Sequence, residues 1–121
     1  MAKKILLVDD SPYILRFIGS SLQNDGYEVI TAENAYDGIE RAIKAIPDLI
    51  IMDLKMPNGN GIDACISIRT APETCHIPII LASAHINELV IKDIHLWGIN
   101  DYIRKPFTPH SLTEKIVALM R

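Results

Sequence analysis

The sequence contains few of the residues and runs that would place it in a specialised class. Two cysteines, six glycines and seven prolines are scattered over 121 residues, which excludes a disulfide scaffold, a collagen-like repeat and a low-complexity chain. The first apolar run, residues 5–8, ends at two aspartates, and no long run follows it. Neither a signal peptide nor a membrane span is therefore expected. We expect one folded domain over residues 1–121, located in the reducing cytoplasm.

Basic residues and spaced metal ligands are also scarce. Twelve Lys and Arg against fifteen Asp and Glu give a net charge of −3. The chain therefore lacks the basic excess of proteins that bind nucleic acid or anionic membranes, and we expect no direct contact with either. Cys65 and Cys75 have no CxxC spacing and are expected to be small packing residues in a reduced protein. The four histidines have no metal-ligand spacing and are expected to be surface or hydrogen-bonded polar residues.

Five short apolar segments predict strands. They lie at residues 5–8, 28–31, 49–52, 77–82 and 102–103. Most are continuous rather than alternating apolar runs, as in strands that are buried on both faces of a parallel sheet.

Segments with helical spacing of apolar residues alternate with these strands. They begin at Ser11-Pro12, near residue 35, near Gly61, near residue 86 and at Thr108-Pro109. A Ser or Thr followed by proline pairs a helix N-cap with a residue suited to the first helical position. Five strand–helix repeats predict right-handed crossovers and a three-layer α/β/α sandwich around a doubly wound parallel sheet.

The helix expected at residues 86–97 has one broad apolar arc. Its members are Ile86, Leu89, Val90, Ile94, Leu96 and Trp97, with Ile91 outside the arc. We interpret most of the arc as core packing. Ile91 and Trp97 are expected to extend an apolar surface for a partner or a second copy of the chain.

Polar residues stand at the carboxyl ends of the predicted strands. They are Asp9, Asp10, Asp53, Ser83 and Lys105. Ligand sites of open parallel sheets lie at this edge. Three carboxylates that converge there repel one another unless a cation neutralises them, and oxygen ligands suit Mg²⁺. Taken singly, Asp10 or Ser83 can equally cap a helix, and Lys105 can be an exposed loop charge.

Together these residues can hold a phosphoryl group on an aspartate. An Asp carboxylate can act as the nucleophile in phosphoryl transfer, and Lys105 and Ser83 can pair with phosphoryl oxygens. Asp53 is the candidate nucleophile because it stands alone at the end of its strand, whereas Asp9 and Asp10 are adjacent and better placed to share a metal. The segment that follows the nucleophile contains proline and glycine and is expected to be an open loop that admits a phosphoryl donor.

Four short motifs resemble those of the response-regulator receiver domain. In chain order they are Val8-Asp9-Asp10-Ser11, Asp53-Leu54-Lys55-Met56-Pro57, Ser83-Ala84 and Lys105-Pro106-Phe107. Each is weak alone, but all four occur in the family's order at the ends of predicted strands, and together they span nearly the whole chain. The resemblance implies a flavodoxin-like doubly wound (βα)5 fold with the five main strands in the order 2-1-3-4-5.

The resemblance also implies a chemistry for the acidic residues. Asp53 would accept a phosphoryl group from the phosphohistidine of a sensor kinase in a two-component phosphorelay. The implied cofactor is Mg²⁺, bound by Asp9, Asp10, the Asp53 side chain and the backbone carbonyl of Lys55.

A conformational switch is implied as well. Ser83 and Lys105 would contact the phosphoryl group, and Tyr102 would move into the space that the Ser83 hydroxyl leaves. The surface made by the fourth helix, the fifth main strand and the fifth helix would then change for a downstream target protein, an output domain or a second copy. Such a protein assists its own phosphorylation and dephosphorylation and is a switch rather than an enzyme.

Three alternatives to this interpretation concern the protein's class and extent. A Mg²⁺-dependent phosphohydrolase with an aspartyl nucleophile would need a second acid two positions after it, where Lys55 stands. A flavin carrier on this fold would need a hydroxyl- and Gly-rich phosphate loop where Asp9 and Asp10 stand. The start at Met1 and the absence of a linker favour a stand-alone regulator over a receiver cut from a longer one.

Overall fold

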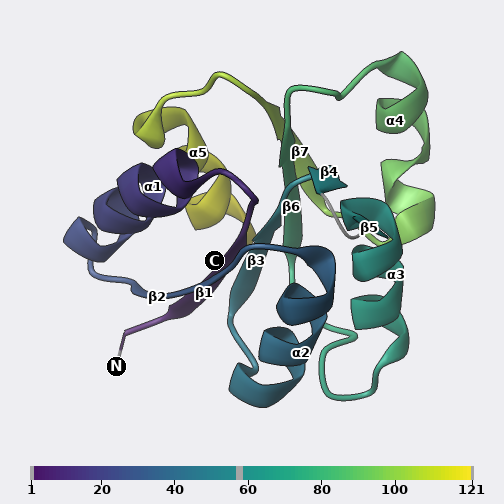
Figure 1. The fold of residues 1–121 in the computed structure, drawn as a ribbon, viewed down its shortest axis with the longest axis horizontal. Helices are drawn as coiled ribbons and strands as arrows, with labels where there is room; N and C mark the ends of the chain where they lie inside the picture. The colour runs from purple at the N-terminus through teal and green to yellow at the C-terminus, as the bar shows by residue number, and fades with distance from the viewer. Residues whose placement is uncertain (1, 57–58, 121) are drawn as a thin grey trace.

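Strands and helices alternate along the chain in the computed structural model, which describes residues 2–56 and 59–120 (Figure 1). The strands are β1 (Lys4–Val8), β2 (Glu28–Ala32), β3 (Leu49–Met52), β4 (Lys55–Met56), β5 (Gly59–Asn60), β6 (Ile79–Ser83) and β7 (Asp101–Arg104). The helices are α1 (Pro12–Asn24), α2 (Ala35–Ala45), α3 (Gly61–Thr70), α4 (Glu88–Asp93), the 3₁₀ helix η1 (Ile94–Trp97) and α5 (Pro109–Leu119).

The main sheet has the predicted order. Its strands run β2-β1-β3-β6-β7, and every neighbouring pair is parallel. This is the expected 2-1-3-4-5 arrangement, with two short additional strands, β4 and β5, numbered in between. Val8 aligns with Met52 and Met52 aligns with Leu81, so the residues that follow β1 and β3 emerge side by side at one edge of the sheet.

Two hydrophobic cores lie on opposite faces of this sheet. In β1, Leu6 and Val8 belong to the core that α2, α3 and α4 cover, whereas Ile5 and Leu7 belong to the core beneath α1 and α5. Figure 1 shows α1 and α5 together on one side and α2 and α3 on the other. Successive side chains of a strand point to opposite faces, so a continuous apolar run supplies both cores. The three-layer prediction is confirmed.

The helix starts follow from side-chain caps. The Ser11 hydroxyl accepts a hydrogen bond from the Ile14 N–H at 3.3 Å, and the Thr108 hydroxyl accepts one from the Ser111 N–H at 3.1 Å. Proline follows each cap, as predicted. Ser83 is not a cap, because Asn87 caps α4 through the Val90 N–H.

The helix expected at residues 86–97 is wrong in part. Only residues 88–93 are α-helical, and the chain then tightens into the 3₁₀ helix η1, which has about 3.0 residues per turn instead of 3.6. The apolar arc drawn at α-helical spacing therefore does not continue through η1, and Leu96 is 81 % exposed. Leu89, in the first turn of the short α4, is 74 % exposed rather than in the core. Ile91 and Trp97 are partly buried and pack against the core.

Two smaller expectations also need correction. The segment after Asp53 forms the short antiparallel β4–β5 pair rather than an entirely open loop, and Pro57 of the quoted motif lies outside the described residues. Cys65 is buried as expected, but Cys75 is exposed because it lies in the irregular segment between α3 and β6.

Over residues 2–56 and 59–120, no helix has the length and apolarity that a membrane crossing requires.

Candidate functional site

Three carboxylates meet at the carboxyl edge of the sheet. One oxygen from each of Asp9, Asp10 and Asp53 lies within 4.8 Å of the others. Asp9 and Asp53 are buried, and Asp10 is exposed. The Asp9 N–H donates to the Ala32 carbonyl at 3.0 Å, and the Asp53 N–H donates to the Val8 carbonyl at 2.9 Å. The sheet's own hydrogen bonds therefore place both buried aspartates.

Lys105 joins the two buried carboxylates. Its ammonium nitrogen lies 2.6 Å from Asp9 Oδ2 and 3.4 Å from Asp53 Oδ2. The second oxygen of each carboxylate accepts a backbone hydrogen bond, from the Ser11 N–H at 2.9 Å for Asp9 and from the Leu54 N–H at 2.8 Å for Asp53. Both carboxylate oxygens of Asp9 thus have short contacts, whereas Oδ2 of Asp53 has only the 3.4 Å contact with Lys105.

The titration of these groups reflects their burial and charge. Burial raises the pKa of Asp53 above its ordinary value, and Asp9 raises it further, against the opposing effects of Lys105 and the Leu54 N–H. Burial acts to lower the pKa of Lys105, but its hydrogen bond and charge contacts with Asp9 and Asp53 outweigh burial and raise that pKa overall. Lys105 therefore remains a cation at neutral pH.

The donor set fits a hard divalent cation. Three ionised carboxylates against the single charge of Lys105 leave two excess negative charges in the cluster, as many as one divalent ion neutralises. All donors are oxygens, which suits Mg²⁺. The exposed side of the cluster is at Asp10, where an ion can retain water ligands. Lys55 follows in the adjoining β4 with an exposed side chain, and its carbonyl remains a predicted ligand.

The two remaining predicted residues lie on the neighbouring strands. Ser83 ends β6 and is fully buried, and its carbonyl accepts from the Lys105 N–H at 3.0 Å. Its hydroxyl accepts from the His85 N–H at 3.0 Å. Tyr102 aligns with Leu81 on β6 and is partly buried against the core that α4 helps to cover.

Gly61 is a site-positioning residue that sequence reasoning missed. It begins α3, and its N–H donates to the Leu54 carbonyl at 2.7 Å. A Cβ at this position would stand 1.9 Å from the Asp53 carbonyl oxygen, so only glycine lets the helix start approach the backbone of Asp53. No local sequence signal marks this residue, because its need for space arises only where α3 meets the Asp53 backbone.

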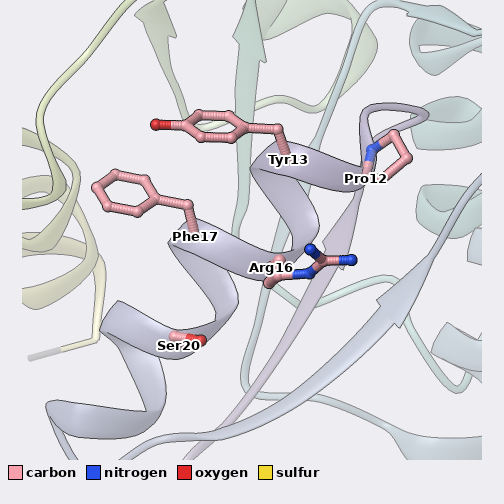
Figure 2. A pocket seen from close by; sticks show the side chains of 5 residues that line it. All are labelled: Pro12, Tyr13, Arg16, Phe17 and Ser20. Atoms are coloured by element: carbon pink, nitrogen blue, oxygen red, sulfur yellow. The ribbon is translucent and has the colours of Figure 1, made fainter.

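An aromatic surface beside the site was also missed. Figure 2 shows a hollow on α1 lined by Pro12, Tyr13, Arg16, Phe17 and Ser20. The Tyr13 and Phe17 rings stack with their centroids 5.5 Å apart, and both are exposed. They also line a second hollow that includes Lys105, so this surface adjoins the carboxylate cluster.

The family assignment rests on the match of a family model. The response regulator receiver domain model matches residues 5–117. The chain belongs to this family. Receiver domains are the signalling switches of two-component systems, typically bind Mg²⁺ in an acidic pocket, and interact with histidine kinases and downstream targets.

Proteins with similar sequences support this family assignment. The chain is 34 % identical over 122 residues to the alkaline phosphatase synthesis transcriptional regulatory protein PhoP of Bacillus subtilis, covering 100 % of this receiver domain and 50 % of PhoP. The chain thus spans about half the length of the bacterial regulators that it matches.

Solved structures give the same fold. The chemotaxis protein CheY4 of Vibrio cholerae superposes with a TM-score of 0.94 at 28 % identity, covering 98 % of this chain and 99 % of CheY4. The receiver domain of sensor histidine kinase PA1611 of Pseudomonas aeruginosa superposes with a TM-score of 0.90 at 28 % identity, covering 99 % of this chain and 98 % of PA1611's receiver chain. That structure is described with a magnesium ion in its active-site cleft.

Proposed function

We propose that residues 1–121 form a single phosphorylation-activated receiver domain in which Asp53 accepts a phosphoryl group from the phosphohistidine of a sensor kinase or phosphotransfer protein. The observation that carries this proposal is the unequal contact of Lys105 with the two buried carboxylates, 2.6 Å to Asp9 and 3.4 Å to Asp53. Of these two buried carboxylates, Asp53 has the less constrained oxygen and is the freer to attack phosphorus.

The transfer step exchanges one bond for another. A lone pair of Asp53 Oδ2 forms a bond to phosphorus, and the phosphorus–nitrogen bond of the donor's phosphohistidine breaks. The departing imidazole keeps that electron pair and takes a proton from solvent, which leaves neutral histidine and an acyl phosphate on Asp53. The exposed side of the carboxylate cluster, at Asp10, is open to the incoming donor.

Charge at the site supports this step. Asp9, Asp10, Asp53 and the Lys55 carbonyl would hold Mg²⁺, which supplies positive charge against the phosphoryl oxygens. Lys105, already cationic and in contact with Asp53, would pair with another phosphoryl oxygen.

Ser83 carries the signal away from the acceptor. Its buried hydroxyl accepts the His85 N–H and has a proton to donate to a phosphoryl oxygen. Rotation toward that oxygen would change the loop after β6 and the space beside Tyr102 on β7. The resulting change would alter the surface formed by α4, β7 and α5, where a downstream target, an output domain or a second copy would bind.

Intact-mass measurement with acetyl phosphate and Mg²⁺ tests this proposal. We expect one added phosphoryl mass in the wild type and none in Asp53→Asn or in the presence of a chelator. Asp63→Asn is the matched control, because Asp63 is an exposed carboxylate in the first turn of α3, outside the acidic cluster. Equal labelling of Asp53→Asn and wild type would show that Asp53 is not the acceptor.

A further inference from the structure

Two cationic side chains lie near the Tyr102 ring. The Arg104 guanidinium carbon is 5.4 Å from the ring centroid, and the Lys115 ammonium nitrogen is 5.7 Å from it. Tyr102 and Arg104 are two residues apart on β7, so their side chains share one face of the strand. Lys115, on α5, is itself held by both carboxylate oxygens of Asp101 at 3.3 and 3.2 Å.

Arg104 has a second contact that Lys115 does not share. Its Nε–H donates to the carbonyl of Ile86 at 3.3 Å. Ile86 is buried in the segment between β6 and α4. The preceding residue, His85, donates its N–H to the Ser83 hydroxyl. One arginine side chain therefore touches both the aromatic ring and the segment that the Ser83 hydroxyl holds.

This segment leads directly into the short helix α4. Asn87, which follows Ile86, caps α4. The helix has six residues, none of them buried, and only the partly buried Val90 and Ile91 pack against the core, so few apolar contacts hold it to the sheet. The Arg104–Ile86 hydrogen bond thus ties the start of α4 to β7.

We propose that Arg104 is a positioning residue that holds the segment before α4 and the Tyr102 ring in the arrangement of this structure, and so opposes the switch. The proposal rests on the function proposed above. When the Ser83 hydroxyl turns toward a phosphoryl oxygen, the His85 N–H loses its acceptor and the segment moves. The Ile86 carbonyl then leaves Arg104, and the guanidinium no longer holds the ring.

Removal of the arginine should favour the switched arrangement before any phosphoryl group is present. A ligand that binds the switched state gains apparent affinity in proportion to that state's population. Loss of one cation–π contact and one hydrogen bond at an exposed position corresponds to a change of about fivefold in such an equilibrium. The aliphatic stem can be kept by Arg104→Met.

The test is an NMR titration with beryllium fluoride and Mg²⁺, a phosphoryl stand-in that binds a carboxylate without group transfer. We expect the half-saturating concentration to fall about fivefold in Arg104→Met. Lys115→Met is the matched control, because it removes the other cation from the ring but leaves the Ile86 contact, and it should stay within twofold of wild type. Equal affinities in Arg104→Met and wild type, or an equal gain in Lys115→Met, would overturn the proposal.

The wild type gives a second measurement that needs no variant. The Arg104 Nε–H resonance should exchange slowly in the free protein and rapidly after beryllium fluoride binds. Unchanged exchange would contradict the proposal that Arg104 releases the Ile86 carbonyl in the switch. Failure of the proposed function has a different signature, since wild type would then not bind the probe at all, or Asp53→Asn would bind it equally well. In that case the inference falls with the function on which it rests.

Discussion

Replacing Gly61 by alanine should displace the phosphoryl acceptor without changing any group of the site. The added Cβ would stand 1.9 Å from the Asp53 carbonyl oxygen and 2.9 Å from Met52 Cγ. Contacts of a real Cβ are essentially never shorter than 3.0 Å, so the Asp53 backbone or the start of α3 must move by about 1 Å. A misplacement of that size costs about 100-fold in rate.

The assay is the initial rate of phosphorylation by acetyl phosphate at saturating Mg²⁺. We expect Gly61→Ala to be about 100-fold slower than wild type. Overpacking of this kind destabilises by about 1–3 kcal/mol, less than the 5–15 kcal/mol stability typical of a domain, so the variant should remain folded at low temperature. A thermal melt checks that point.

Gly19→Ala is the control for the glycine-to-alanine change itself. Its added Cβ would meet nothing closer than Val29 Cγ1 at 3.9 Å, so its phosphorylation rate should match wild type. The reasoning would be refuted by a folded Gly61→Ala protein that is phosphorylated within threefold of the wild-type rate.

Three further predictions concern the charges of the site. Asp53→Asn should raise the free energy of unfolding of the metal-free protein at pH 7 by about 0.5–2 kcal/mol, because a raised pKa means that the ionised carboxylate opposes folding. This gain in stability should shrink as pH falls toward 4. A urea-unfolding series in which Asp53→Asn is less stable than wild type at pH 7 would contradict the prediction. Lys105→Met should lower the free energy of unfolding by about 3 kcal/mol in the same urea series, because it leaves Asp9 and Asp53 buried without their cation. In wild type the stabilisation by Lys105 is present below pH 10.5 and is lost as pH rises through the higher folded pKa of Lys105. Mg²⁺ should raise the melting temperature of wild type, and a chelator should reverse the rise. Asp10→Asn should need at least tenfold more Mg²⁺ for the same rise, and identical titrations of the two proteins would show that the ion binds elsewhere.

The parallel strands and the acidic edge could be predicted because they depend on local signals. Continuous apolar strands end at Asp9 and Asp53, and parallel strands bring their carboxyl ends to one edge. The order of the strands came from the family resemblance rather than from the apolar pattern. The roles of Ser83 and Tyr102 also depend on that resemblance and stay predictions.

The features that sequence reasoning missed depend on tertiary placement. Leu96 has helical spacing in the sequence, but the chain tightens to a 3₁₀ helix and exposes it. Nothing local distinguishes Gly61 from a glycine in an ordinary turn, since its need for space arises only where α3 meets the backbone of Asp53. The contact between Arg104 and Ile86 joins residues 18 positions apart and has no sequence signature.

Locating the phosphoryl group on the chain tests the central claim most directly. After phosphorylation with acetyl phosphate and Mg²⁺, borohydride reduction converts an aspartyl phosphate to homoserine, which peptide mass spectrometry can assign to one position. The account predicts homoserine at Asp53 alone. Homoserine at Asp9 or Asp10, or its absence from a protein that has gained a phosphoryl mass, would contradict it.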